Sequence, residues 1–184
     1  MFLLLLVVVF LHLLFTLKGK NSKIVVSSGK KWGIVGDYML MGEYHYTIDD
    51  KGRITIPLKI REELKDDFII TRGLDKCLYI YSKDEWNNII SKYRELPNTK
   101  DARNFMRFFL SGASVSECDK SGRVKLNKPL MDYANLKKEC VIVGVGDRLE
   151  IWDKDRWDEF YETNEEEMSN IAEDLFDSNW ESGE

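Results

Sequence analysis

The chain has 184 residues, of which 43% are apolar and 32% charged, a composition that indicates a folded globular protein and argues against wholesale disorder. Its net charge is −5, but the charges are unevenly distributed. Residues 1–156 hold all 27 basic residues and 21 acidic ones, and residues 157–184 hold 11 acidic residues. A mildly basic body with an acidic C-terminal segment is compatible with nucleic-acid binding, because local charge governs contact with phosphate. Cys77, Cys118 and Cys140 lack metal-binding spacing and cannot all pair, which favours reduced thiols over a disulfide framework or a zinc site.

The N-terminal segment contains an apolar run over residues 2–15 that only His12 interrupts. A secretory signal would place basic residues before such a run and a small-residue cleavage site after it, whereas here three lysines follow it. A membrane span needs about 20 apolar residues, more than this run provides. Because clear patterning starts only near Met39, we hypothesise that the native chain begins at Met39 or Met41 and that residues 1–38 are translated upstream DNA. A short hydrophobic segment or anchor is the alternative.

The next elements follow a strand–turn–strand–helix–strand–strand–helix order. An Asp-to-Gly turn at residues 49–52 supplies the chemistry of a tight connection between strands. Pro57 suits the first turn of a helix, and Ser82 with Glu85 forms a capping-box pattern before the helix that carries Trp86. The expected strands are 44–48, 53–56, 68–71 and one ending at Tyr81, with a helix over 58–64 between the second and the third.

Two further helices are indicated by apolar residues at helical spacing. Ala102, Phe105, Met106 and Phe109 form one such stripe, ended by Gly112, a residue type that favours helix ends. The second stripe lies on an acidic C-terminal helix. We interpret both stripes as core packing, the two tryptophans 86 and 157 as core anchors, and the acidic residues as a solvated face. The second stripe consists of Met168, Ile171, Ala172, Leu175 and Phe176.

The chain contains an internal repeat. Asp49-Asp50-Lys51-Gly52-Arg53-Ile54 recurs as Asp119-Lys120-Ser121-Gly122-Arg123-Val124, and Leu78-Tyr79-Ile80-Tyr81-Ser82-Lys83-Asp84-Glu85-Trp86 recurs as Leu149-Glu150-Ile151-Trp152-Asp153-Lys154-Asp155-Arg156-Trp157. Two motifs in the same order at nearly one offset indicate a tandem duplication. We therefore divide the chain into a first unit, residues 41–110, and a second unit, residues 111–184, which ends in the acidic helix. The second unit is expected to have strands at 113–118, 123–126 and 140–143, one ending at Trp152, and a helix over 130–134 opened by Pro129, with Asp153 as the N-cap of the helix that carries Trp157.

The duplicated Asp-x-x-Gly-Arg turn is the most distinctive candidate site. Asp49 and Asp119 can accept backbone N–H groups and shape the turns, while Gly52 and Gly122 permit positive φ. Each arginine leaves its turn with a planar fork of donors suited to phosphate oxygens or a guanine edge. An aspartate and an arginine four residues apart can also pair, which would orient that fork. One such turn is weak evidence for function, but its duplication within the same series of elements is much stronger.

From Met41 to about Phe176 the sequence resembles the MraZ family. The segment Gly42-Glu43-Tyr44-His45-Tyr46-Thr47-Ile48-Asp49-Asp50-Lys51-Gly52-Arg53-Ile54-Thr55-Ile56-Pro57 is similar to the N-terminal signature of that family, and Asp119 to Arg123 matches its second motif. The resemblance implies an α+β fold, namely a tandem AbrB-like swapped-hairpin β-barrel with flanking short helices. It also implies a cytoplasmic, nucleoid-associated transcription regulator that binds direct repeats in the promoter of the division and cell-wall gene cluster, including its own, as a ring-shaped homo-oligomer.

Mapped by motif, the resemblance makes Arg53 and Arg123 the expected contacts to double-stranded DNA, with Lys51 and Lys120 beside them. The family pattern is altered at Asp50, whose extra carboxylate should weaken phosphate contact at the first turn. No cofactor, metal, small-molecule substrate or membrane partner is expected.

Two other classes of protein compete with a DNA-binding regulator. An enzyme is disfavoured because His12 and His45 are the only histidines and no catalytic triad or phosphate-binding loop is present. An AbrB-fold antitoxin or a structural interaction protein without promoter specificity is the alternative. Antitoxins of that kind usually carry one hairpin unit and a disordered tail, so the duplication argues against them.

Overall fold

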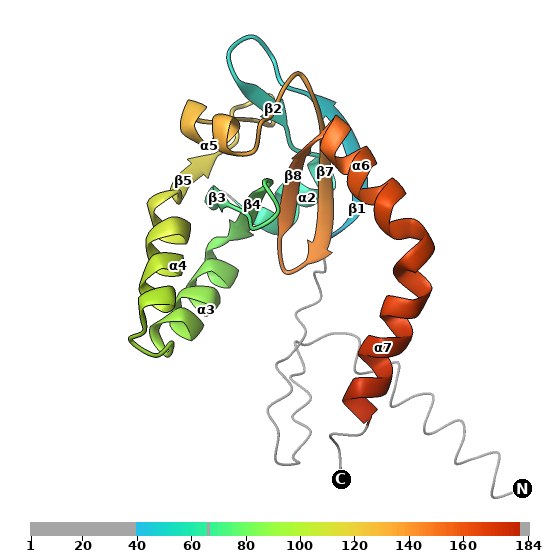
Figure 1. Ribbon diagram of the computed structural model, residues 1–184. Helices are drawn as coiled ribbons and strands as arrows, with labels where there is room; N and C mark the ends of the chain where they lie inside the picture. The colour runs from blue at the N-terminus through green and yellow to red at the C-terminus, as the bar shows by residue number, and fades with distance from the viewer. Residues whose placement is uncertain (1–39, 66, 181–184) are drawn as a thin grey trace, which may run out of the picture. The chain divides into compact units, whose positions relative to one another are not determined.

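The computed structural model describes residues 40–65 and 67–180, so the hypothesis about residues 1–38 lies outside the described part of the chain. The described residues form a mixed α+β structure with antiparallel strands and several short helices, which confirms the expected fold class (Figure 1). The elements in chain order are β1 (Leu40–Thr47), β2 (Arg53–Thr55), α2 (Leu58–Leu64), β3 (Asp67–Arg72), β4 (Leu78–Ser82), α3 (Lys83–Arg94), α4 (Lys100–Ser111), β5 (Ser114–Glu117), β6 (Arg123–Lys125), α5 (Lys128–Tyr133), β7 (Glu139–Gly146), β8 (Leu149–Asp153), α6 (Lys154–Asn164), the 3₁₀ helix η1 (Glu165–Glu167) and α7 (Met168–Trp180).

The strands of the two repeats share one main sheet and do not form two separate sheets. The main sheet has the order β1-β7-β8-β4-β3-β5, and all its pairs are antiparallel. The first strand of each repeat therefore pairs with the third strand of the other repeat, β1 with β7 and β5 with β3. At the centre, β4 and β8 pair with Tyr79 opposite Glu150, which are equivalent positions of the two repeats. This arrangement gives the repeats an approximate two-fold relation.

The strands that follow the Asp-to-Gly turns form a separate two-stranded ribbon. β2 pairs with β6, with Ile54 opposite Val124, and backbone bonds from Ile56 N to Gly122 O and from Leu126 N to Gly52 O, both 2.9 Å, extend the contact. The strands flanking each turn pair with strands of the other repeat and not with each other. A closed barrel is also not found in the described residues, since β1 and β5 are the two unjoined edges of the main sheet.

The core lies on both faces of the main sheet because side chains alternate along each strand. In β4, Leu78 and Ile80 enter one buried cluster, whereas Tyr79 and Tyr81 enter another. The first cluster draws on both repeats and fills the space beneath α2, α5 and the β2–β6 ribbon. Its equivalent pairs are Ile54 with Val124, Ile56 with Leu126, Ile60 with Leu130, and Leu64 with Ala134.

The two C-terminal helices of the first repeat pack differently from those of the second. α3 and α4 fold back on each other (Figure 1), and Phe109 of α4 is 1% exposed and stacked on Trp86, with 5.4 Å between ring centroids. Trp86 and Trp157 both pack against the second cluster, as the sequence predicted. In the second repeat, α6 continues through η1 directly into α7. Core packing of the α7 stripe was a wrong prediction, because Met168, Ile171 and Leu175 are 45%, 37% and 58% exposed.

Local capping follows the sequence with one exception. The Ser82 side chain accepts a hydrogen bond from Glu85 N at 3.2 Å and begins α3. Asp153 occupies the N-cap position of α6, but its carboxylate accepts from Lys137 N at 3.0 Å and makes no cap bond. None of the helices within residues 40–65 and 67–180 is long and apolar enough to cross a bilayer.

Candidate nucleic-acid interface

The first turn is closed by the carboxylate of Asp49. Its Oδ1 accepts the backbone N–H groups of Lys51 and Arg53, both at 2.9 Å. Gly52 N donates to Asp49 O at 2.8 Å, and Gly52 has a φ of +73°, a conformation that costs a residue with a Cβ roughly 1–2 kcal/mol. These bonds hold the turn in one shape.

The second turn repeats this geometry around Asp119. Its Oδ1 accepts Ser121 N at 2.9 Å and Arg123 N at 3.0 Å, and Gly122 has a φ of +75°. The same residue types at the same spacing therefore produce the same turn twice. The two turns lie side by side, since Arg53 Nη1 is 3.7 Å from Asp119 Oδ2 and Arg123 Nη1 is 3.9 Å from Asp49 Oδ2.

The two aspartates and two arginines of the turns form a compact ion-pair quartet. Arg53 places Nε 2.8 Å and Nη2 2.7 Å from Asp49 Oδ2, and Arg123 places Nε 3.0 Å and Nη2 2.8 Å from Asp119 Oδ2. Each remaining Nη1 faces the other turn, 3.7 Å from Asp119 for Arg53 and 3.9 Å from Asp49 for Arg123. The arginines expected to contact DNA are thus tied, through two of their three guanidinium nitrogens, to the aspartates of their own turns.

Charge pairing in the quartet shifts the acid–base behaviour of both aspartates. The pKa of Asp49 is lowered to about 2, first because the Arg53 side chain donates to it and then because backbone N–H groups do. The pKa of Asp119 is lowered to about 2 by the equivalent bonds from Arg123 and the turn backbone. Both carboxylates are therefore ionised at any physiological pH, and the quartet carries no net charge.

The turn tips carry the other predicted residues. Lys51 and Lys120 are exposed, and neither ammonium group forms an ion pair within the part of the chain that the structure describes. Asp50 is exposed beside Lys51, whereas the second turn has Lys120 and an exposed Ser121 at the corresponding positions.

Sequence reasoning missed one residue beside each turn. A Cβ built on Gly122 would lie 2.4 Å from the guanidinium carbon of Arg61, so that side chain, from α2, covers the second turn. A Cβ built on Gly52 would lie 3.5 Å from Sδ of Met131 on α5, the repeat equivalent of Arg61. The repeat offset of 70 could have matched these two positions, but nothing in the sequence placed them next to the turns.

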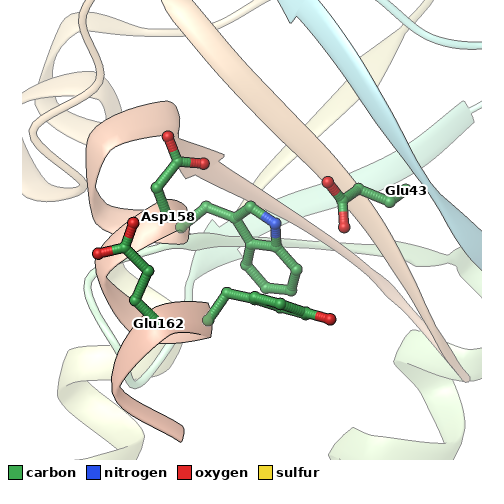
Figure 2. A pocket seen from close by; sticks show the side chains of 5 residues that line it. Glu43, Asp158 and Glu162 are labelled. Atoms are coloured by element: carbon green, nitrogen blue, oxygen red, sulfur yellow. The ribbon is translucent and has the colours of Figure 1, made fainter. Parts of the chain in front are cut away.

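A pocket between β1 and α6 has a different chemistry. It is lined by Glu43, Trp157, Asp158, Tyr161 and Glu162, and Figure 2 shows Glu43 across from the aromatic rings and the other two carboxylates. Three carboxylates repel a phosphate backbone, so this pocket does not suit DNA.

The described residues hold no cluster of three or more His, Cys, Asp or Glu side chains that could bind a metal ion. All three thiols are free, and burial raises the pKa of Cys77 and of Cys140 to about 12, which keeps these two protonated and unreactive.

The fold and the paired turns define an α+β protein built from two interleaved repeats, each with one arginine-bearing turn. A family model described as "MraZ protein, putative antitoxin-like" matches the chain in two tandem segments, residues 39–108 and 109–179. The chain therefore belongs to the MraZ family.

Proposed function

We propose that this protein is a sequence-specific, DNA-binding transcription regulator of the division and cell-wall gene cluster, which binds direct repeats in its own promoter. It acts without catalysis and without a cofactor, in the cytoplasm at the nucleoid. It assembles as a ring of identical subunits with swapped-hairpin units, so that several pairs of turns reach the DNA at once.

The observation that carries the proposal is the pairing of the two turns. Two copies of one rigid turn lie side by side, held by the quartet of Asp49, Arg53, Asp119 and Arg123. Exposed lysines stand at both tips. Rigid turns with cations at their tips suit phosphate contact, and each arginine still has one nitrogen, Nη1, outside the ion pair with its own turn.

Several subunits are needed because each chain has only a few cations at its two turns. Affinity from phosphate contacts falls with salt, with a slope of about −0.9 per phosphate neutralised. Two lysines and two partly committed arginines supply only a few such contacts. Simultaneous binding to several DNA repeats can raise overall affinity by on the order of 10²–10⁴, so binding should depend steeply on the number of repeats and on ionic strength.

The decisive experiment is a gel shift with the DNA upstream of the protein's own reading frame. We expect binding that weakens as repeats are removed and that exceeds binding to unrelated duplex. Lys51→Ala, Lys120→Ala, Arg53→Ala and Arg123→Ala should each weaken it while the protein stays folded by circular dichroism. Lys92→Ala, which removes an exposed charge from α3, should leave it unchanged. Normal binding by all four turn variants and by Arg53→Ala/Arg123→Ala would contradict the proposal.

The exposed apolar stripe of α7 favours a second candidate, an antitoxin-like or structural interaction protein without promoter specificity. Met168, Ile171 and Leu175 form this stripe on an acidic helix, a pattern typical of protein–protein contact. Equal affinity for the upstream DNA and for unrelated duplex would favour this candidate over the first.

A further inference from the structure

The quartet leaves little free charge at the centre of the two turns. Arg53 and Arg123 each share two nitrogens with an aspartate, so their charges are offset by Asp49 and Asp119. A DNA phosphate that approaches the turns is therefore attracted mainly by cations outside the quartet. One such cation belongs to a side chain outside the repeat motif.

The Arg61 side chain lies beside the second turn. Its guanidinium lies against Gly122, with Nη1 2.4 Å and Nε 2.8 Å from the place of a Cβ on that glycine. It forms no side-chain hydrogen bond or ion pair within residues 40–65 and 67–180, and its Nε is buried without an acceptor. A buried donor without an acceptor is costly, and a guanidinium fork matches the oxygens of a phosphate. Only Nε of this guanidinium is buried without a partner, so the Nη groups are the atoms that would meet a phosphate at this turn.

The first turn lacks this cation. At the equivalent position, Met131 places its sulfur over Gly52. The tip of the first turn adds Asp50 and Lys51, whose charges cancel, whereas the tip of the second turn adds Lys120 and the hydroxyl of Ser121. With Arg61 and Met131 included, the second turn has two positive charges outside the quartet and the first turn has none in excess.

We propose that Arg61 is a DNA-phosphate contact and that it makes the second turn, at Lys120–Ser121–Gly122, the stronger phosphate-binding turn of the pair. The inference rests on the proposed DNA-binding function. The two-fold related turns of one chain are then chemically unequal, so that each subunit has a preferred orientation on the double helix. A direct repeat, which has a direction, is the kind of target that unequal turns can distinguish.

The repeat offers its own matched variants for a test. Arg61→Met gives the second turn the residue of the first, and Met131→Arg does the reverse. Lys59→Met removes a charge from the same helix two residues away, a spacing that turns a side chain through about 200°. Binding of the full chain to its upstream DNA and to an unrelated duplex is measured by fluorescence anisotropy over a series of salt concentrations, and folding is checked by thermal melting.

We expect Arg61→Met to weaken binding roughly tenfold, as for loss of a charged hydrogen bond, and to reduce the salt slope by about 0.9 for each subunit in contact. Met131→Arg should strengthen binding and steepen the slope, and Lys59→Met should leave the slope unchanged. In the wild-type protein, Lys120→Ala should cost more affinity than Lys51→Ala, and in Arg61→Met/Met131→Arg this order should reverse.

The outcomes separate the two proposals. Equal slopes for the wild type and Arg61→Met, or an equal loss with Lys59→Met, would overturn the role of Arg61 even if promoter binding is specific. If the wild type binds upstream and unrelated duplexes alike, promoter specificity fails, while the slopes on either duplex still decide the role of Arg61. No binding to any duplex would overturn both. If Arg61→Met does not fold, the comparison of Lys120→Ala with Lys51→Ala decides, and equal losses there would count against the proposal.

Discussion

At the scale of single residues, the turn aspartates act on structure more than on any ligand. Each accepts two backbone N–H groups through one oxygen and a guanidinium through the other. The residues that form the turns and the aspartate–arginine pairing were foreseeable, because both follow from local spacing. The approach of Arg61 to Gly122 was not, since it joins residues 61 positions apart that meet only when the repeats interleave.

The first prediction concerns acid titration of the quartet. Because the pKa of Asp49 and of Asp119 in the folded protein is about 2, below the ordinary 3.8, the stability contributed by these ion pairs is fully present above pH 3.8 and is lost as the pH falls towards 2. Carbon-13 NMR of the side-chain carboxyls should give midpoints near 2 for both residues. Midpoints at 3.8 or higher would show that the pairs do not persist in solution.

A second prediction at this scale uses the close approach of β1 and β7. Gly42 faces Gly144, and a Cβ on Gly144 would lie 2.4 Å from Met41 N and 2.6 Å from Leu40 C. Backbone atoms cannot give way as a flexible side chain can, so Gly144→Ala should push the start of β1 off the sheet. Hydrogen exchange should then speed up at residues 40–42 and stay slow in the β2–β6 ribbon.

Gly146→Ala is the control for that variant. Gly146, unlike Gly144, has a positive φ, +95°, and a Cβ there meets nothing within 4 Å. It should reduce stability through backbone strain and leave exchange along the start of β1 unchanged. Faster exchange at residues 40–42 in both variants would mean that strain, rather than contact with β1, is responsible.

At the scale of elements, two stripes with the same spacing reach different environments. On α4, Phe105 packs against Tyr93, and Phe109 packs against Tyr93 and Trp86. The α7 stripe stays exposed. The sequence difference lies in the connection. The residues between α3 and α4 include Pro97, which cannot continue a helix. Between α6 and α7, by contrast, the three glutamates of η1 are themselves helical, so the helix continues from α6 into α7.

The stripes give a paired stability prediction. Phe109→Ala should lower the free energy of unfolding by roughly 3–5 kcal/mol, because it empties a fully buried aromatic site. Leu175→Ala, on the exposed stripe, should change it by less than about 0.5 kcal/mol. Urea denaturation at equal protein concentration measures both. A large loss for Leu175→Ala would show that α7 is covered in solution, and a small loss for Phe109→Ala would contradict the packing of α4.

At the scale of the whole molecule, the repeats are parts of one folding unit. The core cluster takes equivalent residues from both repeats, and each repeat lends its first strand to the other. The net charge of the described residues supports DNA binding less than the basic balance of residues 1–156 suggested. Residues 40–156 hold 22 basic and 20 acidic residues, so their charge is nearly balanced, and the case for DNA binding depends on the local charge at the turns.

Interleaving predicts that half-chains do not fold alone. A fragment of residues 39–110 or 111–184 lacks the partner strands for β3 or β7 and exposes half of a shared core, so we expect each to be unfolded as a monomer. Mixing the two fragments, or pairing of a fragment with its own copy, should restore strand structure. Circular dichroism with sedimentation measures this. A folded monomeric half with a cooperative unfolding transition would contradict the interleaved core.

The sequence by itself determined the duplication, the order of the strands and helices, the α+β class, the shape of both turns and the family. All of these depend on residue spacing and local backbone chemistry, and the repeated motif provides that information in two places. Only the tertiary structure decided which strands of the two repeats pair, that the sheet stays open at β1 and β5, that α7 leaves its stripe exposed, and that Arg61 and Met131 make two like turns unequal. Those features depend on contacts between residues far apart in the chain, and the pattern of either repeat alone carries no information about which side chain of the other repeat will meet it.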